Sequence, residues 1–189
     1  MIKAIIFDCF GVLASDGWLP FRERYFGNKP RLLEQAISFN KAVDAGISTY
    51  DEFISQIATL AGISREQVRD EIENNIPDET LFAYISQDLK PHYKIGMLSN
   101  VADDWLDEIF TREQVQLFDA VALSYEIGSI KPELASYKTI AERLGVDASE
   151  CIFIDDQPKY CEGAIEAGMQ AIMYTGLPQL THDLTRILR

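Results

Sequence analysis

Cysteine, histidine and basic residues are all scarce in this chain of 189 residues. Its three cysteines include no CxxC pair and its two histidines lie far apart, so neither a disulfide framework nor a zinc site is expected. No apolar run approaches the roughly 18 residues of a membrane-spanning helix. Asp8 also interrupts the first apolar stretch too early for a signal peptide. We therefore expect a cytoplasmic protein with no membrane partner.

Lys and Arg are outnumbered by Asp and Glu, 17 to 30, which gives a formal net charge of −13. Binding to nucleic acid depends on basic side chains that replace counterions around phosphates, so a nucleic-acid partner is not expected. The apolar fraction of 47% is ordinary for a globular protein with a good core. The length fits one domain, or one domain with a modest insertion. These quantities leave the oligomeric state and the function open.

Five short apolar runs along the chain each have the length of a β-strand. They cover residues 4–7, 95–98, 120–123, 152–154 and 171–174. They are continuously apolar rather than alternating, which is typical of parallel strands covered on both faces. Helical patterns over residues 103–113 and 132–144 lie between the later runs, and Gly145 and Gly168 are typical helix C-terminal signals. The alternation predicts an α/β fold with a doubly wound parallel sheet.

Residues 14–90 interrupt this alternation, because they separate the first two strands and have only helical patterns. Ser64 begins a capping-box pattern, and Ser48 and Asp78 are candidate helix N-caps. We therefore predict a core domain made of residues 1–13 and 91–189, with residues 14–90 as a small helical cap domain. An insertion at this point leaves the sheet at its carboxyl edge, where open α/β folds bind ligands.

Polar clusters follow four of the predicted strands. Asp8 closes the first, Ser99-Asn100 the second and Asp155-Asp156 the fourth, while Lys131 follows the third. A parallel sheet would bring all four clusters to one edge. Carboxylates at that edge suit Mg²⁺, Asp8 can act as a nucleophile, and Lys131 with Ser99-Asn100 can hold phosphate oxygens. The set therefore indicates phosphoryl chemistry.

These four motifs, in this order, resemble those of the haloacid dehalogenase-like (HAD) hydrolase superfamily, small helical-cap type, from residue 2 to about residue 176. The resemblance implies a Rossmann-like HAD core and a Mg²⁺-dependent phosphatase or phosphotransferase. Such an enzyme acts on a small phosphorylated metabolite through an aspartyl-phosphate. The residues implied are Asp8 and Lys131 for catalysis, Ser99, Asn100 and Lys131 for substrate binding, and Asp8, Asp155, Asp156 and the backbone carbonyl of Phe10 for the metal.

One position departs from the family pattern, because Phe10 stands where the usual acid/base Asp would be. Loss of a general acid typically costs about 10²- to 10⁴-fold in rate. Three explanations stay open: a substrate with a good leaving group, a proton donor from the cap, or a non-catalytic protein that binds phosphorylated ligands.

A metal-free 2-haloacid dehalogenase is a further alternative. Halide departure needs no proton, and the family's 2-haloacid dehalogenases carry an aromatic residue at the position of Phe10. Asp155-Asp156 argues against this alternative, because an intact acidic pair would repel the carboxylate of a haloacid.

Two further features have a structural and a functional interpretation. Cys9 faces away from Asp8 if the strand alternates, so we predict a core residue. Residues 18–31 mix aromatic and basic side chains. They either face the site and hold an anionic substrate, or form an amphipathic helix that packs its aromatic side chains. The sequence alone favours neither interpretation.

Overall fold

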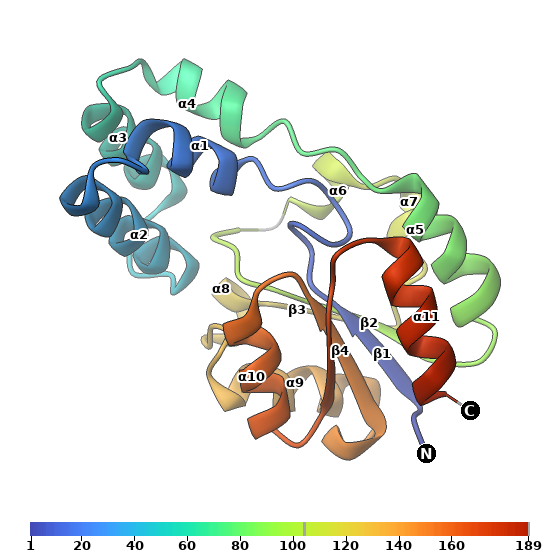
Figure 1. The fold of residues 1–189 in the computed structure, drawn as a ribbon. Helices are drawn as coiled ribbons and strands as arrows, with labels where there is room; N and C mark the ends of the chain where they lie inside the picture. The colour runs from blue at the N-terminus through green and yellow to red at the C-terminus, as the bar shows by residue number, and fades with distance from the viewer. Residues whose placement is uncertain (104, 189) are drawn as a thin grey trace.

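Five parallel β-strands form the centre of the molecule, in the order β3-β2-β1-β4-β5 (Figure 1). The computed structural model describes residues 1–103 and 105–188. The strands are β1 (Ala4–Phe7), β2 (Lys94–Ser99), β3 (Ala120–Leu123), β4 (Cys151–Asp155) and β5 (Gln170–Met173). β1 pairs with β2 on one side and β4 on the other, so the strand order reverses at β1. The predicted doubly wound sheet is confirmed, and every strand boundary lies within one residue of the prediction.

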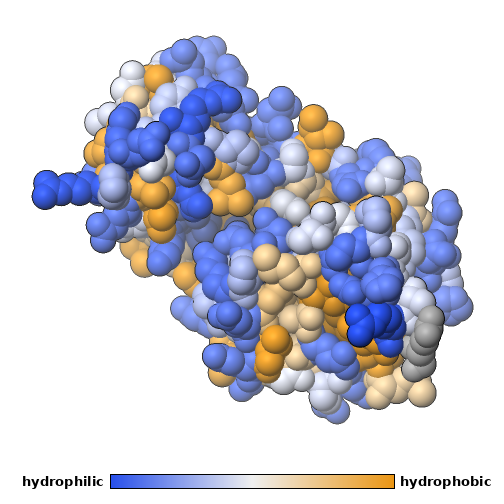
Figure 2. Space-filling view, in the orientation of Figure 1, coloured by the Kyte–Doolittle hydropathy of each residue, from blue (hydrophilic) through white to orange (hydrophobic). Residues whose placement is uncertain are grey.

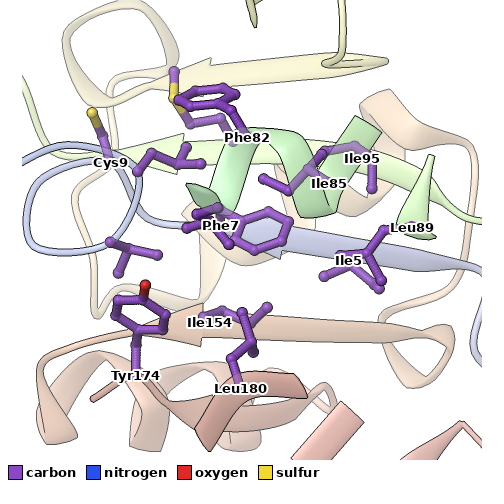
Figure 3. Close-up of a cluster of buried hydrophobic side chains, with 14 of the residues drawn as sticks. Ile5, Phe7, Cys9, Phe82, Ile85, Leu89, Ile95, Ile154, Tyr174 and Leu180 are labelled. Carbon is purple, nitrogen blue, oxygen red and sulfur yellow. The ribbon is translucent and has the colours of Figure 1, made fainter. Parts of the chain in front are cut away.

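Both faces of the sheet are covered by helices, which explains why the strands are continuously apolar. Ile5 and Phe7 belong to one apolar cluster, under α5 (Glu79–Tyr84), the π-helix Ile85–Leu89 and α11 (Leu177–Ile187) (Figure 3). Ala4 and Ile6 belong to a second cluster, under α9 (Leu134–Leu144) and α10 (Pro158–Glu166). Alternate residues of β1 therefore stabilise opposite layers.

A helical insertion between β1 and β2 has an apolar core of its own. It contains α1 (Trp18–Phe26), α2 (Pro30–Asp44), α3 (Tyr50–Ala61) and α4 (Arg65–Ile72). Phe21, Phe26, Ile54 and Ile57 are buried within this cluster. The insertion lies at the upper left of Figure 1, and it forms a separate lobe in the space-filling view of Figure 2.

The separate helical core is shorter than the predicted cap of residues 14–90. Leu81, Phe82, Ile85 and Leu89 are buried in the cluster on the sheet rather than in the insertion. Residues 79–89 therefore cover one face of the core sheet. The helical pattern of this segment is correct, but a pattern does not reveal which sheet or helix its apolar face meets.

Helix starts agree with the predicted caps, except at α3. Ser64 caps α4 in a capping box, and the Asp78 carboxylate accepts hydrogen bonds from the first turn of α5. The N-cap of α3 is Thr49, one residue beyond the predicted Ser48, and Glu52 completes the box with Thr49. Ser48 has no glutamate three residues later, whereas Thr49 does, so the box selects Thr49.

Two helices differ from the predicted ranges. Instead of one helix over residues 103–113, there are two short ones, α6 (Leu106–Ile109) and α7 (Arg112–Val115), and Asp104 lies outside the described residues. Phe110 between them is extended and buried, and Thr111 starts a new capping box. The helix predicted from residue 132 begins at Leu134 in α9, because Glu133 at its N-cap is extended.

The remaining elements are α8 (Ser124–Ile127) and a 3₁₀ turn, Ala148–Glu150. Gly145 ends α9 in the left-handed conformation, as predicted. Cys9, Cys151 and Cys161 are buried free thiols, and Cys9 lies in the sheet core as its alternation predicts. Within residues 1–103 and 105–188, no helix has both the length and the hydropathy to cross a membrane.

Candidate active site

Asp8 lies at the carboxyl edge of the sheet, directly after β1. Its amide donates to the Ile154 carbonyl at 2.9 Å, so the backbone pairing with β4 continues to this residue. Its Oδ1 accepts a hydrogen bond from the Cys9 amide at 2.7 Å and lies 2.6 Å from Lys131 Nζ. The residue is only 5% exposed. Among the described residues Oδ2 has no hydrogen-bond partner, so one oxygen is fixed and the other is available.

Lys131 stands between two carboxylates. Its Nζ lies 2.6 Å from Asp8 Oδ1 and 2.7 Å from Asp155 Oδ2, and the residue is 2% exposed. The ring of Tyr160 lies 4.7 Å away on the α10 side. Burial lowers the pKa of Lys131, but attraction to Asp155 and Asp8 outweighs burial, and the pKa lies above its ordinary value. The side chain is therefore a fixed positive charge at the sheet edge.

The acidic pair that closes β4 divides into two environments. Asp155 is fully buried, and its Oδ1 accepts from the Gln157 amide at 2.8 Å while Oδ2 meets Lys131. Asp156 Oδ1 is buried with no hydrogen-bond partner among the described residues. Burial, together with the neighbouring charge of Asp155, raises the pKa of Asp156 to about 6. Asp155 therefore holds the lysine, and Asp156 has an oxygen that no described protein group satisfies.

A glycine allows the loop after β1 to approach this pair. Gly11 has a φ of +86°, and a Cβ there would lie 2.5 Å from Asp156 Oδ2. Any larger residue would be strained in the backbone and would clash with the carboxylate.

The three carboxylates fit a hard divalent cation. Oxygen atoms of Asp8, Asp155 and Asp156 lie within 4.8 Å of one another. When all three are ionised, their three negative charges beside the single positive charge of Lys131 leave an excess of two negative charges. The unsatisfied oxygen of Asp156 and the Asp8 carboxylate would be natural ligands for Mg²⁺, which prefers carboxylate oxygens and retains water. A cation would also offset the repulsion among these carboxylates.

Ser99 and Asn100, the second predicted pair, differ in the hydrogen bonds that they form. Ser99 Oγ is buried with no hydrogen-bond partner in the described part of the chain, and it lines the cavity described below. Asn100 instead brackets the backbone of Lys131, since its Oδ1 accepts from the Lys131 amide at 2.8 Å and its Nδ2 donates to the Lys131 carbonyl at 3.1 Å. Both side chains line the cavity, and Asn100 in addition holds the backbone of Lys131.

Phe10 offers an aromatic wall in place of an acid. Its ring centroid lies 4.8 Å from that of Trp105. Both side chains line the cavity. No proton donor therefore comes from this position of the loop.

A cavity of about 970 Å³ separates the sheet edge from the helical insertion. The core contributes Asp8, Ser99 and Lys131, and the insertion contributes Trp18 and Arg22, among other residues. Phe21 and Phe26 of the same α1 are buried in the insertion. One face of α1 therefore packs within the insertion and the other meets the cavity, and the binding of an anionic substrate there stays a prediction.

Sequence reasoning missed Asp44 and Ser124. Asp44 lines the cavity from the last turn of α2, and Ser124 Oγ donates to the Asp44 carbonyl at 2.7 Å. One signal was available for Asp44. An acid at a helix C-terminus interacts unfavourably with the helix dipole, so its presence there is not explained by helix stability. Ser124 carried no signal, because its contact joins residues 80 positions apart.

Comparisons with known proteins show the family of this chain. A model of the haloacid dehalogenase-like hydrolase family matches residues 2–168. The chain belongs to this family. It is 31% identical to Phosphatase MT3486 of Mycobacterium tuberculosis (strain CDC 1551 / Oshkosh), over 99% of this chain and 94% of that protein. The resemblance based on four motifs is thus confirmed at the level of the family.

Solved structures of HAD proteins share the fold. The HAD family enzyme bt-2542 of Bacteroides thetaiotaomicron, in complex with magnesium and inorganic phosphate, is 26% identical with a TM-score of 0.72, and all of both chains is covered. An L-2-haloacid dehalogenase of Xanthobacter autotrophicus, with chloropropionic acid covalently bound, is 20% identical with a TM-score of 0.67, covering 98% of this chain and 83% of that one. Because the dehalogenase is only 20% identical to this chain, the similarity between the two concerns the fold alone.

Proposed function

We propose that this HAD-like hydrolase cleaves the phosphate monoester of a small metabolite, with Asp8 as nucleophile and Mg²⁺ at the carboxylates. The observation that carries the proposal is Lys131 Nζ, held 2.6 Å from Asp8 and 2.7 Å from Asp155, beside the unsatisfied oxygen of Asp156. The similarity to Phosphatase MT3486 and to a HAD enzyme bound to magnesium and phosphate supports it.

The roles follow from the positions of the side chains. Asp8 Oδ2 attacks phosphorus in line and forms an aspartyl-phosphate, which water then cleaves. Lys131 and the Ser99 hydroxyl hold the phosphoryl oxygens, and Asn100 keeps the Lys131 backbone in place. Mg²⁺, held by Asp8, Asp156 and the Phe10 carbonyl, would supply the positive charge that offsets the anionic substrate and the carboxylates. Asp155 contributes mainly as the partner of Lys131.

Basic side chains in the cavity wall support an anionic substrate. Arg22, Lys41 and Lys159 line the cavity, and within the described residues they form no ion pair. Burial first, then the charges of Lys41 and Arg22, lower the pKa of Lys159. These unpaired positive charges can bind an anionic group despite the net charge of −13, although acidic side chains also line the cavity. The substrate we propose is a small metabolite whose non-phosphate part also carries an anionic group.

The first test is turnover of p-nitrophenyl phosphate in Mg²⁺ and in EDTA. We expect phosphate release in Mg²⁺, its loss in EDTA, and a loss of about 10³-fold or more in Asp8→Asn. Asp88→Asn, an exposed site far along the chain, is the matched control and should keep full activity. Activity that survives EDTA or Asp8→Asn would contradict the mechanism.

Dehalogenation is the second candidate, and the contact between Phe10 and Trp105 favours it because no acid is present there. The unsatisfied Asp156 beside two other carboxylates disfavours it, since a haloacid is itself an anion. Chloride release from 2-chloropropionate in EDTA would establish this candidate. Binding of inorganic phosphate without turnover of any ester would instead favour the non-catalytic alternative.

A further inference from the structure

Phe10 leaves the reaction without a proton donor on the loop after β1, so a general acid must come from elsewhere in the cavity wall. Besides Asp8, six acidic residues of the described chain line it: Asp16, Asp44, Glu73, Asp103, Glu108 and Glu133. A general acid must line the cavity that holds the leaving group, must be in an environment that lets it carry a proton on a free carboxyl oxygen, and must be held in place. These three requirements separate the six.

Five of these acids fail at least one requirement. Glu73 pairs with Arg69 at 2.6 Å, and Glu133 accepts from Ser129 Oγ at 2.8 Å. Asp16 lies at the start of α1, where the amides of Trp18 at 2.7 Å and Leu19 at 3.1 Å donate to its Oδ1 and favour the carboxylate over the protonated acid. Asp103 and Glu108 are exposed, and nothing among the described residues fixes their carboxylates.

Asp44 meets all three. Its Oδ2 accepts from Asn40 Nδ2 at 2.6 Å, and Oδ1 has no hydrogen-bond partner among the described residues. It lines the same cavity as Asp8, at the C-terminal end of α2, where the helix dipole disfavours a carboxylate and so favours the protonated acid. It is half-buried in the cavity wall.

A buried hydroxyl ties Asp44 to the core. Ser124 Oγ donates to the Asp44 carbonyl at 2.7 Å and accepts from the Val101 amide at 2.9 Å. Ser124 follows β3 and Val101 lies two residues beyond β2. The end of α2 is therefore anchored to the first residue of α8 and, through it, to the loop after β2, which gives a residue of the insertion a fixed place at the cavity.

We propose that Asp44, supplied by the helical insertion, is the general acid of the phosphatase reaction and replaces the acid missing at Phe10. The proposal rests on the proposed function. In the first half-reaction Asp8 Oδ2 forms a bond to phosphorus, the bond from phosphorus to the ester oxygen breaks, and the Asp44 proton moves to that oxygen. The products are a neutral alcohol and the Asp44 carboxylate.

The second half-reaction restores the enzyme. A water molecule occupies the place that the alcohol leaves. The oxygen of this water bonds to phosphorus while the Asp44 carboxylate accepts a proton from the same water. The bond between phosphorus and Asp8 breaks with its electrons returning to the carboxylate, and inorganic phosphate departs. Asp44 is then protonated again, so no proton is gained or lost beyond those of water and ester.

The electrostatic environment suits this role. Burial raises the pKa of Asp44 to about 7, against the opposing effects of Lys131, Lys159 and the Asn40 hydrogen bond. Asp16 and Tyr160 are the other titratable groups that interact with it. A large fraction of Asp44 is therefore protonated near neutral pH, where a general acid works best.

The experiment compares two esters of similar shape that differ in their leaving groups. p-Nitrophenyl phosphate releases a stable anion, whereas p-nitrobenzyl phosphate releases an alkoxide that needs a proton. We expect Asp44→Asn to lower kcat/KM for the benzyl ester by about 10²- to 10³-fold and for the phenyl ester by less than about 10-fold. Glu34→Gln, exposed on the same α2 and outside the cavity wall, should change neither.

Several outcomes would overturn the proposal. Equal losses for the two esters would assign Asp44 a positioning role, and unchanged benzyl-ester turnover would show that it takes no part. Wild-type protein that cleaves the phenyl ester but not the benzyl ester would show that no acid acts at all. Failure of wild-type protein on both esters would instead refute the proposed function, and Asp8→Asn separates that case from the others.

Wild-type protein gives a second measurement that does not depend on a variant folding. The ratio of kcat/KM for the benzyl ester to that for the phenyl ester should fall as the pH rises above about 7, because Asp44 loses its proton there. A ratio that stays constant from about pH 6 to about pH 9, a range that includes the expected transition, would also overturn the proposal.

Discussion

Lys131 shows how single side chains set the character of this site. Its ammonium is buried with two carboxylates in contact, and Asn100 holds its backbone from both sides. A buried ion pair adds little net stability, yet removing one partner leaves the other charges buried without compensation, which is strongly destabilising. The same arrangement holds the Asp8 carboxylate at the cavity, so the structure and the proposed catalysis depend on one contact.

Replacement of the lysine tests this dependence. Lys131→Met leaves Asp8 and Asp155 buried without their counter-charge, and we expect the free energy of unfolding to fall by about 3–5 kcal/mol. Urea denaturation at neutral pH measures it, with Lys138→Met, an exposed position on α9, as control. A loss below about 1 kcal/mol would show that the carboxylates do not rely on Lys131.

The raised pKa of Asp44 also makes the free energy of unfolding depend on pH. Burial raises its pKa in the folded protein to about 7, from an ordinary value of 3.8, so the folded state binds more protons than the unfolded state between these values. Stability from this residue is therefore lost as the pH rises from about 4 to about 7. Asp44→Asn removes the titration and should stabilise the protein at pH 8 by about 1–3 kcal/mol, with little change near pH 4.

Urea denaturation of both proteins at the two pH values measures this difference. Glu34→Gln again serves as control, since Glu34 is exposed on the same helix. Equal stabilisation at both pH values would mean that the Asp44→Asn substitution acts through packing rather than through the lost charge, and the electrostatic account of Asp44 would fail.

At the scale of helices and strands, local sequence signals predict the structure correctly where contacts between neighbouring residues determine it. The box of Ser64 and the cap at Asp78 involve residues two or three positions apart, and both are present. The helix predicted over residues 103–113 is divided because Phe110 enters the sheet core, which is a long-range contact. Residues 79–89 lie within the predicted cap range but pack on the sheet, because an apolar helix face does not specify its partner.

At the scale of the molecule, the sheet and the edge that carries the site could be predicted together. Four polar clusters after four strands converge in any parallel sheet, so Asp8, Lys131 and Asp155 meet without further information. The position of Asp44 could not be derived, because it depends on how α2 docks on Ser124. The net charge of −13 was uninformative about the substrate, because Arg22, Lys41 and Lys159 gather in one cavity of an acidic protein.

The central claim is that Asp8 receives the phosphoryl group, and mass spectrometry of the acid-quenched enzyme tests it most directly. Wild-type protein is mixed with p-nitrophenyl phosphate in Mg²⁺, quenched during turnover and digested. We expect a phosphoryl group on the peptide that carries Asp8, and none in Asp8→Asn or in EDTA. Turnover in which that peptide is never phosphorylated, or phosphorylation that persists in Asp8→Asn, would contradict the account.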